Sequence, residues 1–550
     1  MSQIVVNNLT FSYDTAYENI FEQVSFRIDT DWRLGFIGRN GRGKTTFLNL
    51  LMGKYEYKGS ITASVNFDYF PFEVKDESLN TLDIVKNRIA PFAEWERQME
   101  HYLKLATENE KVDDRERIEQ PANKELFNKV EDDPLVSYGR LQELYQANDG
   151  YIIEELIEKE LGKLQVDLSV LSRPFSTLSY GERTKVMLAA LFLKKNNFLL
   201  IDEPTNHLDM EGRDTLAEYL QGKKGFILVS HDRAFLDRCI DHVLSINRNN
   251  IEVQKGNYST WQKNKEWMDN YELEKNEQLK KDISSLSEAA RRAMGWSDKV
   301  EASKIGGHVF DRGAVGHKAA KMMKRAKAIE NRKLEAIEER KSLLKNIEQP
   351  DELKMNVLAF PKKRFIEAED LCLYYGNREV VSHINFTLMM GERIALAGGN
   401  GSGKSSLLKL LLGEDITYRG RYFVASGLKI SYISQDTSYL SGSLEDFSQK
   451  YGLDETIFKT VLRQLDFSRT QFEKDISEFS GGQKKKVLLA KSLAEPAHLF
   501  IWDEPLNFVD VYSRIQIEEL LLKYLPTMIF VEHDRVFREK ISTKVVELSI

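Results

Sequence analysis

The stretch GRNGRGKTT at residues 38–46 follows the apolar run LGFI, and it returns as GGNGSGKSS at residues 398–406 after IALA. Both copies fit the pattern GxxxxGK[ST]. In this pattern the glycines let backbone N–H groups close around phosphate oxygens, the lysine meets the charge of the β- and γ-phosphates, and the hydroxyl binds Mg²⁺. An apolar strand directly before the pattern is the context that a phosphate-binding loop requires. Two copies in this context predict two nucleotide sites on one α/β chain.

Three more motifs recur in the same order, which makes the chain an internal repeat. They are LSYGE at 178–182 and FSGGQ at 479–483, LLIDEPTNHLD at 199–209 and LFIWDEPLNFVD at 499–510, and VSHDRAF at 229–235 and VEHDRVF at 531–537. Lys44 precedes Ser179 by 135 residues, whereas Lys404 precedes Ser480 by only 76. The first copy therefore carries an insert of about 59 residues, mostly polar and of helical character.

The segment between the two copies has a different composition. Apolar residues recur at near-helical spacing from about 260 to 294, and again in a stretch that ends at Pro350. GWSDKVEASKIGGHVFDRGAVG at 295–316 interrupts this pattern with five glycines. Two long helices joined by a glycine-rich tip are typical of an antiparallel helical hairpin. The predicted organisation is a first copy at 1–255 with a helical insert at about 90–165, a hairpin at 256–350 with its tip at about 295–316, and a second copy at 351–550.

Each copy ends an apolar run with the acidic pair Asp-Glu. Asp202 and Asp503 are placed to face Mg²⁺, which prefers carboxylate oxygens. Glu203 and Glu504 follow directly and are placed to polarise an attacking water. An acid that caps a helix after a strand is the structural alternative, but both copies repeat the pair with proline next. The sequence therefore predicts a hydrolytic site in each copy.

Two histidines and two tyrosines complete the candidate sites. His231 and His533 follow the apolar runs FILV and MIFV within a shared HDR sequence. That context favours a hydrogen-bonding sensor of the γ-phosphate over a structural histidine. Tyr13 and Tyr375 precede the core of each copy and are candidates to stack on adenine. Aromatic side chains are also common on β-strands, so the pattern leaves both alternatives open for the tyrosines.

The composition of the chain excludes several classes of protein. Its 550 residues and 42% hydrophobic content indicate ordinary globular domains, about three or four of them. Cys239 and Cys372 are the only cysteines, which argues against a disulfide framework and for a reducing cytosol. The N-terminus lacks the pattern of a signal peptide, and there is no run of about 18 apolar residues to predict a membrane span. The expected location is cytoplasmic.

The repeated motifs resemble those of the ATP-binding cassette superfamily. Tandem cassettes without membrane segments, joined by a long charged hairpin, resemble the ABC-F proteins, and KGNYSTWQ at 255–262 and YGRLQELYQANDGYIIEELI at 138–157 support that resemblance. In this family two cassettes sandwich two ATP molecules, each between a phosphate loop and the signature motif of the other cassette. The resemblance, which covers essentially the whole chain, implies a monomer with intramolecular cassette pairing that uses ATP and Mg²⁺.

The resemblance carries the family's site residues onto the matching positions of this chain. The residues expected to bind the two nucleotides are Tyr13, Gly38, Asn40, Gly41, Gly43, Lys44, Thr45, Thr46, Ser179, Gly181, Asp202, Tyr375, Gly398, Asn400, Gly401, Gly403, Lys404, Ser405, Ser406, Gln435, Ser480, Gly481, Gly482 and Asp503. Those expected around Mg²⁺ are Thr45, Asp202, Ser405, Gln435 and Asp503. The expected catalytic residues are Glu203, Glu504, His231 and His533.

The chain departs from the family pattern at one point in each site. Phe72 stands where the family usually has a glutamine after a strand, whereas the second copy keeps Gln435. Tyr180 stands in the first signature motif where glycine is usual. Because each site has its own irregularity, we expect the two sites to hydrolyse ATP at unequal rates.

The predicted hairpin differs in charge from the rest of the chain. Residues 291–333 contain twelve Lys or Arg and four Asp or Glu, a net charge of +8, while the rest of the chain has −15. A cationic rod on an acidic body suits a phosphate-rich partner through counterion release, whereas a solvated coiled coil would mix the signs more evenly. The residues expected near RNA or a bound drug are Trp296, Lys299, Lys304, His308, Phe310, Arg312, Lys318, Lys321, Lys324 and Arg325.

In ABC-F proteins the hairpin enters the exit site of the ribosome, and its tip approaches the peptidyl-transferase centre. VFDRGAVGHKAAKMMKR at 309–325 is most similar to the antibiotic-resistance branch of the family. The resemblance therefore implies a ribosome-associated ATPase that binds the exit site and rRNA of the bacterial 70S ribosome, displaces peptidyl tRNA and dislodges lincosamides, pleuromutilins and streptogramin A. A housekeeping factor that tunes elongation is the alternative. An exporter ATPase has no use for the basic hairpin, and a DNA-repair ATPase would need zinc ligands that two cysteines cannot supply.

Overall fold

The computed structural model describes residues 2–13, 19–116, 134–206, 208–246, 251–302, 353–376 and 378–548. The chain divides into two compact units. One is Met1–Tyr258 together with Glu352–Ile550, and the other is Ser259–Asp351. Both copies of the sequence repeat therefore belong to one compact unit.

Each copy is built around a parallel sheet. In the first copy the strand order is β5-β6-β7-β3-β8-β9, in which only β8 and β9 pair antiparallel. The bounds are β3 Arg33–Ile37, β5 Asn66–Phe70, β6 Asn197–Asp202, β7 Phe226–Val229, β8 His242–Ile246 and β9 Ile251–Lys255. The second copy has the all-parallel order β14-β15-β16-β12-β17, with β12 Arg393–Ala397, β14 Ile430–Ile433, β15 Leu499–Asp503, β16 Met528–Val531 and β17 Lys544–Glu547. The predicted α/β class of both copies is confirmed.

A smaller antiparallel sheet accompanies each parallel sheet. Its order is β2-β1-β4 in the first copy and β11-β10-β13 in the second. The bounds are β1 Gln3–Phe11, β2 Phe21–Asp29, β4 Lys58–Thr62, β10 Arg364–Tyr375, β11 Arg378–Met389 and β13 Thr417–Val424. One hydrophobic core in the first copy joins Ile4 of β1, Leu200 of β6 and Phe47 of the helix after the phosphate loop. That helix is therefore anchored to both sheets of its copy.

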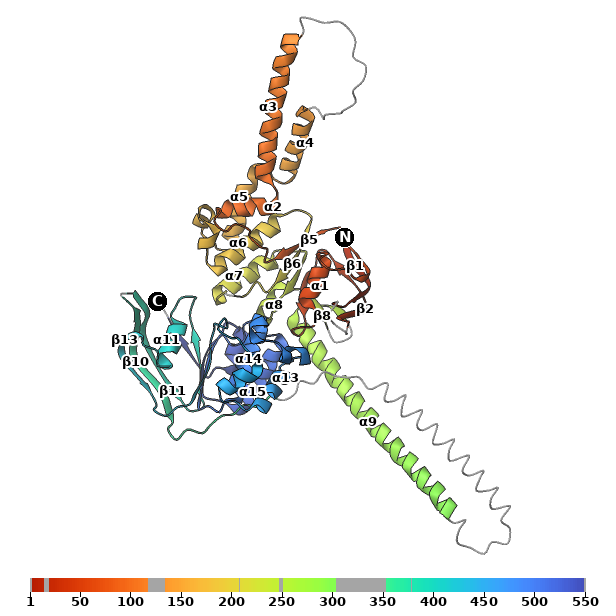
Figure 1. Ribbon diagram of the computed structural model, residues 1–550, viewed down its shortest axis with the longest axis vertical. Coiled ribbons are helices and arrows are strands. Elements are labelled where there is room, and N and C mark those ends of the chain that lie inside the picture. Colours follow the sequence, from red (N-terminus) through yellow and green to blue (C-terminus); the bar gives the residue numbers. More distant parts are fainter. Residues whose placement is uncertain are drawn as a thin grey trace, which may run out of the picture. The chain divides into compact units, whose positions relative to one another are not determined.

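Helices follow the strands in the same order in both copies (Figure 1). The matching helices are α1 Lys44–Leu51 and α11 Lys404–Leu411, α6 Tyr180–Leu193 and α14 Gly481–Ala494, α7 Met210–Gln221 and α15 Val511–Tyr524, and α8 Arg233–Cys239 and α16 Arg535–Ile541. The second copy also has α12 Leu444–Lys450 and α13 Glu455–Gln464. None of the helices described is both long and apolar enough to cross a membrane. Parallel strands end at one edge of a sheet, so the motifs after β3, β6 and β7 meet there.

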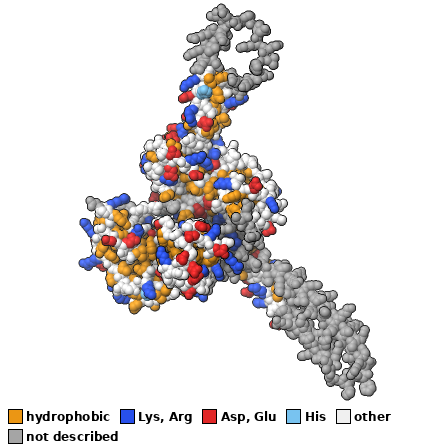
Figure 2. Space-filling model, in the orientation of Figure 1, with side chains coloured by type: hydrophobic (Ala, Val, Ile, Leu, Met, Phe, Trp, Pro, Cys, Tyr) orange, Lys and Arg blue, Asp and Glu red, His pale blue; other side chains and the backbone are white. Residues whose placement is uncertain are grey.

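The insert of the first copy is helical over its described residues. It contains α3 (Phe92–Glu116), α4 (Pro134–Ala147) and α5 (Ile153–Lys163), which follow α2 (Thr81–Ile89), and α3 and α4 lie side by side (Figure 1). Tyr145 of α4 packs edge-on against Phe92 of α3, and both side chains are buried. Hydrophobic side chains also remain on the surface of this helix pair (Figure 2), among them Leu103, Leu135 and Leu144. Residues 117–133, which include part of the acidic stretch of the insert, lie outside the described residues.

The described part of the segment between the copies is one helix, α9 (Tyr258–Ala302). It runs through Gly295, so the predicted interruption of the helix is wrong for residues 295–302. A glycine inside a helix costs only about 1 kcal/mol relative to alanine, and the residues directly before this one, 291–294 (RRAM), are good helix formers. Trp296 and Lys299 therefore lie on a helix and not in a tip loop. The other expected tip residues and the predicted second helix lie outside the described residues, namely Lys304, His308, Phe310, Arg312, Lys318, Lys321, Lys324 and Arg325.

Candidate active sites

The last glycine of each phosphate loop has a backbone conformation that other residues rarely adopt. Gly43 has a φ of 94° and Gly403 a φ of 82°, both in the left-handed region. A Cβ atom on Gly43 would lie 2.5 Å from Ile20 Cγ2, and one on Gly403 would lie 2.3 Å from Val381 Cγ2. Backbone conformation and space thus both require glycine here. The helices α1 and α11 begin at the next residue, so their first N–H groups are available to an anion.

The lysine of each loop folds over the loop itself. Lys44 Nζ donates to the carbonyl oxygen of Gly38 at 2.7 Å, and Lys404 Nζ donates to that of Gly398 at 2.9 Å. Both side chains are buried, and burial lowers the pKa of both lysines. A buried ammonium held at the rim of a phosphate loop is placed to meet an anionic phosphate. We call the site built on Lys44 the first site and the site built on Lys404 the second site.

The predicted glutamates follow β6 and β15 in the same unusual conformation. Glu203 and Glu504 both have a φ of 49°. A left-handed backbone costs a non-glycine residue about 1–3 kcal/mol and persists only where the surrounding structure imposes it. The N–H groups of the two glutamates donate to the carbonyl oxygens of Val229 at 2.9 Å and Val531 at 3.0 Å. The same strain at equivalent positions of two copies is typical of residues held for a function.

Each predicted histidine lies beside the glutamate of its own copy. His231 Nε2 is 3.4 Å from Glu203 Oε1, and His533 Nε2 is 3.4 Å from Glu504 Oε1. Both rings are buried. Burial, together with the charge of Lys44, lowers the pKa of His231 well below its ordinary value, so this ring is neutral. The structure therefore brings together in each copy the two side chains that the motifs predicted to share a site.

The two glutamates differ in charge because their neighbours differ. Burial raises the pKa of Glu203 to about 8. Burial acts in the same direction on Glu504, but hydrogen bonds from His533 and Gln435 lower its pKa to about 2. The registers of β5 with β6 and of β14 with β15 place Phe72 at the position of Gln435. Glu504 is therefore ionised at neutral pH, whereas burial and the charge of Asp202 make Glu203 the weaker acid of the two.

Phe72 is held by a neighbouring cation. The guanidinium carbon of Arg88 lies 4.7 Å from the centroid of the Phe72 ring, a cation–π geometry. Arg88 in turn forms an ion pair with Asp68 of β5 at 2.6 Å. The departure from glutamine is thus accommodated by local packing in the first copy.

Tyr69 is a residue of the first site that the motifs did not reveal. It lies on β5, and its hydroxyl donates to Asp202 Oδ2 at 2.8 Å. Thr45 Oγ1 donates to the same carboxylate oxygen at 3.4 Å. Burial and the charge of Asp202 raise the pKa of Tyr69, so the hydroxyl stays protonated and can donate. In the sequence this residue looks like any aromatic on a strand, and only the register of β5 identifies it.

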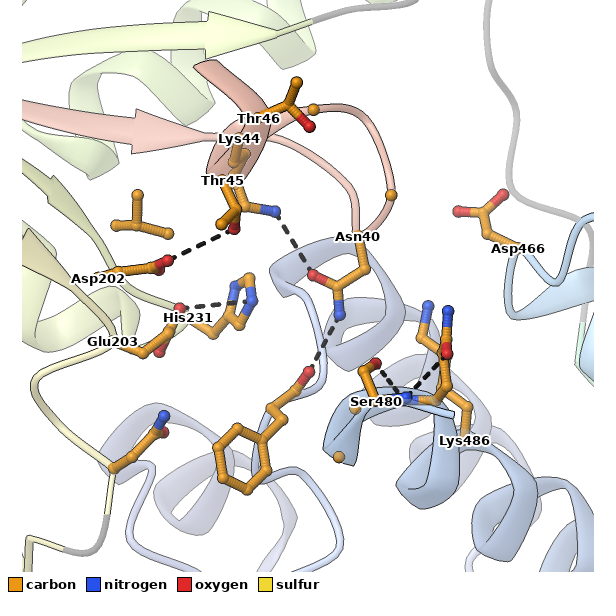
Figure 3. A pocket seen from close by; sticks show the side chains of 18 of the residues that line it. Asn40, Lys44, Thr45, Thr46, Asp202, Glu203, His231, Asp466, Ser480 and Lys486 are labelled. Atoms are coloured by element: carbon orange, nitrogen blue, oxygen red, sulfur yellow. Dashed lines mark hydrogen bonds and ion pairs between the residues drawn. The ribbon is translucent and has the colours of Figure 1, made fainter. Parts of the chain in front are cut away.

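A cavity of about 600 Å³ lies between the two copies at the first site (Figure 3). Its expected lining residues are Tyr13, Asn40, Gly41, Gly43, Lys44, Thr45, Thr46, Asp202, Glu203 and His231 of the first copy and Ser480, Gly481 and Gly482 of the second. Asn40 Nδ2 donates to the carbonyl oxygen of Phe508 at 3.0 Å and so joins the copies. The phosphate loop of one copy thus shares a cavity with the signature motif of the other, and the volume is that of a small-molecule site.

Several lining residues were not predicted. They are Ile20, Tyr69, Pro71, Asn206 and Val229 of the first copy and Asp466, Phe467, Gln471, Gln483, Lys486 and Phe508 of the second. Lys486 Nζ forms a buried ion pair with Asp510 Oδ2 at 2.8 Å. In Figure 3, Lys486 and Ser480 lie across the cavity from Thr45 and Asp202. Among these second-copy residues, Asp466, Phe467, Gln471 and Lys486 belong to none of the recurring motifs, and only the pairing of the copies brings them to the first site.

The serines of the two signature motifs cap the helices that follow them. Ser480 Oγ accepts the N–H of Gln483 at 3.4 Å at the start of α14, and Ser179 Oγ accepts that of Glu182 at 3.3 Å at the start of α6. In both helices the side chain at the third helical position bonds back to the serine N–H, which completes a capping box. Because Ser480 lines the cavity, the amino end of α14 opens into it, where the helix dipole favours an anion.

The second site also has a hydrogen bond between the copies. The N–H of Asn400 donates to Asp209 Oδ2 of the first copy at 3.4 Å. Gly398, Gly401 and Gly403 lie in the loop before α11, Ser405 and Ser406 lie in its first turn, and Gln435 follows β14. Ser179 and Gly181 lie at the start of α6. Tyr180 between them is 69% exposed, so its bulk is accommodated at the surface of the signature motif.

The two tyrosines expected to stack on adenine have different surroundings. Tyr13 lines the cavity, its hydroxyl lies 2.9 Å from Thr46 Oγ1, and its ring meets Phe11 edge-on. Tyr375 ends β10 and is 50% exposed. The first tyrosine is therefore already part of a site, and the second presents half of its surface to solvent.

Comparisons with known proteins agree with this geometry. A family profile described as ABC transporter matches residues 21–206 and 381–507. The ribosome protection protein VmlR of Bacillus subtilis is 31% identical over 386 residues, which cover 68% of this chain and 69% of VmlR. ABC transporter F family member 2 of Arabidopsis thaliana is 25% identical over 571 residues, which cover 100% of this chain and 76% of that protein. The chain belongs to the ABC-F family.

Further similarities extend over nearly the whole chain of this ABC-F member. The energy-dependent translational throttle protein EttA of Escherichia coli O6:H1 is 25% identical over 547 residues, which cover 96% of this chain and 89% of EttA. The archaeal ribosome recycling factor aABCE1 has the same fold, with a TM-score of 0.56 at 16% identity over 98% of this chain and 87% of that one. As an ABC-F protein with two cassettes, the chain is an ATPase that converts ATP and water to ADP and phosphate.

The residues of both sites fit the Mg²⁺ that ABC ATPases use with ATP. Thr45 and Asp202 lie together in the first site, and Ser405 hydrogen-bonds to Asp503 in the second. Asp503 Oδ1 is buried and has no hydrogen-bond partner among the described residues. Within the described residues there is also no cluster of three or more His, Cys, Asp or Glu that would hold a metal alone. One carboxylate and one hydroxyl suit Mg²⁺, which takes its remaining ligands from phosphate oxygens and water.

We expect Tyr69→Phe to weaken Mg²⁺ binding at the first site, so that hydrolysis there requires more Mg²⁺. A hydrogen bond to a charged group contributes about 1.5–3 kcal/mol, so the Mg²⁺ concentration for half-maximal activity should rise about tenfold. The measurement is phosphate release against Mg²⁺ concentration in an E504Q background, in which the first site carries the remaining activity. The same substitution in an E203Q background is the control and should leave the Mg²⁺ dependence unchanged. An unchanged dependence in both backgrounds would show that Tyr69 only packs.

Proposed function

We propose that the chain is an ATP-driven ribosomal protection protein that acts on the bacterial 70S ribosome. The observation that carries this proposal is the 31% identity over 386 residues to VmlR, whose name describes it as a ribosome protection protein. The net charge of +8 over residues 291–333 supports it, because a cationic segment suits rRNA. The protein is proposed to act in the cytoplasm as a monomer, with its two cassettes paired within one chain.

In this proposal each site binds ATP between a phosphate loop and a signature motif. The residues that bind the phosphates are Lys44 and Lys404 with the loop glycines, and those that close on them from the other cassette are Ser480 and Gly482 at the first site and Ser179 and Gly181 at the second. Cavity walls from both cassettes at the first site support this arrangement. ATP binding thus draws the cassettes together.

The hydrolytic step is assigned to the glutamates and histidines. Glu203 and Glu504 accept a proton from the attacking water, and His231 and His533 contact the γ-phosphate. The distance of 3.4 Å between each histidine and its glutamate supports a shared role. The difference in pKa between the two glutamates supports unequal rates at the two sites.

The segment at 256–350 is the part proposed to enter the exit site of the ribosome. Its tip then approaches the peptidyl-transferase centre, displaces peptidyl tRNA and dislodges lincosamides, pleuromutilins and streptogramin A. Hydrolysis reopens the cassettes and releases the ribosome. The basic residues of 291–333 are proposed to contact rRNA, with a strong dependence of binding on salt concentration.

A housekeeping role in elongation is the second candidate, and the similarity to EttA over 96% of this chain favours it. We expect a drug-sensitive strain that expresses the protein to tolerate more lincosamide and pleuromutilin than the same strain with the E203Q/E504Q variant. Minimum inhibitory concentrations measure this difference. A rise with the wild-type protein alone supports protection. Equal concentrations for both strains, together with ribosome binding, would favour the elongation factor.

A further inference from the structure

A buried lysine on the signature helix of the second cassette contacts two catalytic segments. Lys485 lies on α14 and is 2% exposed. Its Nζ donates to the carbonyl oxygen of Ser434 at 2.9 Å and to that of Asp503 at 3.4 Å. Ser434 directly precedes Gln435, and Asp503 directly precedes Glu504. One ammonium group therefore joins the backbones of the segments that carry the glutamine and the glutamate of the second site.

A buried glutamate holds the remaining segment of the same site. Glu532, which precedes His533, is 5% exposed. Its Oε1 accepts the N–H of Leu506 at 2.7 Å, and its Oε2 accepts the N–H of His533 at 3.2 Å. Burial lowers the pKa of Lys485, and nearby carboxylates act in the opposite direction. Glu532 has the largest effect among them, followed by Glu504. Lys485 and Glu532 thus hold the backbones of all three catalytic segments of the second site.

The first cassette has neutral residues at both matching positions. Thr184 lies five residues after Ser179, as Lys485 lies five after Ser480, and Ser230 precedes His231 as Glu532 precedes His533. Ser230 Oγ lies 3.2 Å from Thr205 Oγ1 and accepts the N–H of Asp232 at 3.2 Å. Glu532 favours the charged form of Lys485, and Arg514 is the main cation that acts on Glu532. The second cassette therefore has both charged residues, and the first cassette has neither.

We propose that Lys485 and Glu532 are positioning residues that hold Gln435, Glu504 and His533 in the geometry for water attack, and that this pair makes the second site the faster of the two. The proposal rests on the roles assigned to the glutamates and histidines above. Lys485 and Glu532 act through other residues, because their hydrogen bonds go to backbone atoms of the catalytic segments. Thr184 and Ser230 leave the first site without this support.

The two sites allow the positioning role to be separated from a role in folding. Ser480, Gly481 and Gly482 at the start of α14 line the cavity of the first site, so damage to this helix would impair that site as well. Lys485, on the same helix, contacts only segments of its own cassette in its two hydrogen bonds. Loss confined to the second site therefore distinguishes positioning from misfolding.

The test is the double substitution K485T/E532S, which installs the residues of the first cassette and removes both charges together. In an E203Q background, in which the second site carries the activity, kcat should fall by about tenfold or more, because small misplacements of catalytic groups have effects of this size. KM for ATP should change little, because Lys404 and its loop are untouched. In an E504Q background, single-turnover hydrolysis at the first site should be unchanged.

Control variants distinguish a positioning role from a structural role and from a wrong assignment of the glutamates. T184V, at the position of Lys485 in the first cassette, should leave both backgrounds at their starting rates. Equal losses in both backgrounds would overturn the proposal in favour of a structural role, and an unchanged kcat in the E203Q background would overturn it directly. E203Q/E504Q is measured first. If that variant retained turnover, the assignment of the glutamates would fail, and this failure is visible before K485T/E532S is interpreted.

Discussion

The double variant E203Q/E504Q is expected to lose ATP hydrolysis and to stay bound to 70S ribosomes in the presence of ATP. An amide cannot accept the proton of the attacking water, and loss of a general base lowers a rate by about 10²–10⁴-fold. Lys44 and Lys404 and their loops are untouched, so ATP should still bind and hold the cassettes together. Phosphate release and co-sedimentation with ribosomes measure the two effects.

The single variants and the choice of nucleotide serve as controls for this experiment. E504Q is expected to lose more activity than E203Q, because hydrogen bonds from His533 and Gln435 lower the pKa of Glu504 and keep it ionised at neutral pH, whereas burial raises the pKa of Glu203. Comparable losses would contradict unequal sites. With ADP in place of ATP the double variant should leave the ribosome. A double variant that is inactive but does not sediment with ribosomes would remove the ribosome from the proposed function and leave an ATPase.

The motif residues could be placed from the sequence because they depend on a short stretch of chain. Each phosphate loop follows a buried strand, and the aspartate, glutamate and histidine also follow strands whose ends share one edge of a parallel sheet. Their mutual proximity is therefore a consequence of strand order. The sequence identifies Phe72 because the family usually has a glutamine after this strand, and the registers of β5 and β14 place it at the position of Gln435.

Some residues belong to a site only because of the register of a strand or the pairing of the two copies, and the motifs do not identify them. In the sequence Tyr69 is one aromatic residue among several on a strand. Only the pairing of β5 with β6 shows that it lies beside Asp202. Lys486 comes to the first site only because α14 belongs to the opposite cassette. The predicted break at Gly295 is wrong because a single glycine costs a long helix little. Lys485 and Glu532 were visible as differences between the two copies, and a position-by-position comparison of the repeat would have found them.

We expect Glu518→Ala to destabilise the unit that contains both cassettes. Glu518 lies on α15 of the second copy and is completely buried, and Arg233, on α8 of the first copy, is its partner. Arg233 Nη1 lies 3.3 Å from Glu518 Oε2, and Lys540 Nζ donates to the same oxygen atom at 3.0 Å. Removing one partner of a buried ion pair costs about 3–5 kcal/mol where the other charge is left uncompensated. Asp534 Oδ2, which lies 3.8 Å from Arg233 Nη2, offsets part of this loss. Urea titration and calorimetry of the purified chain measure the loss.

The repeat itself provides the control for this substitution. Arg535 occupies the position of Arg233 in the second copy, but it pairs with Glu539 and both side chains are 62% exposed. An exposed pair of this kind contributes little to stability, so E539A should have little effect. R233M/E518L removes both buried charges and should restore much of the stability, because apolar replacements of buried pairs are often neutral. If E518A reduced the stability as little as E539A, Arg233 and Glu518 would not form a buried link between the copies. If E518A is severe, this link helps to keep the two copies paired, and both sites should lose activity together.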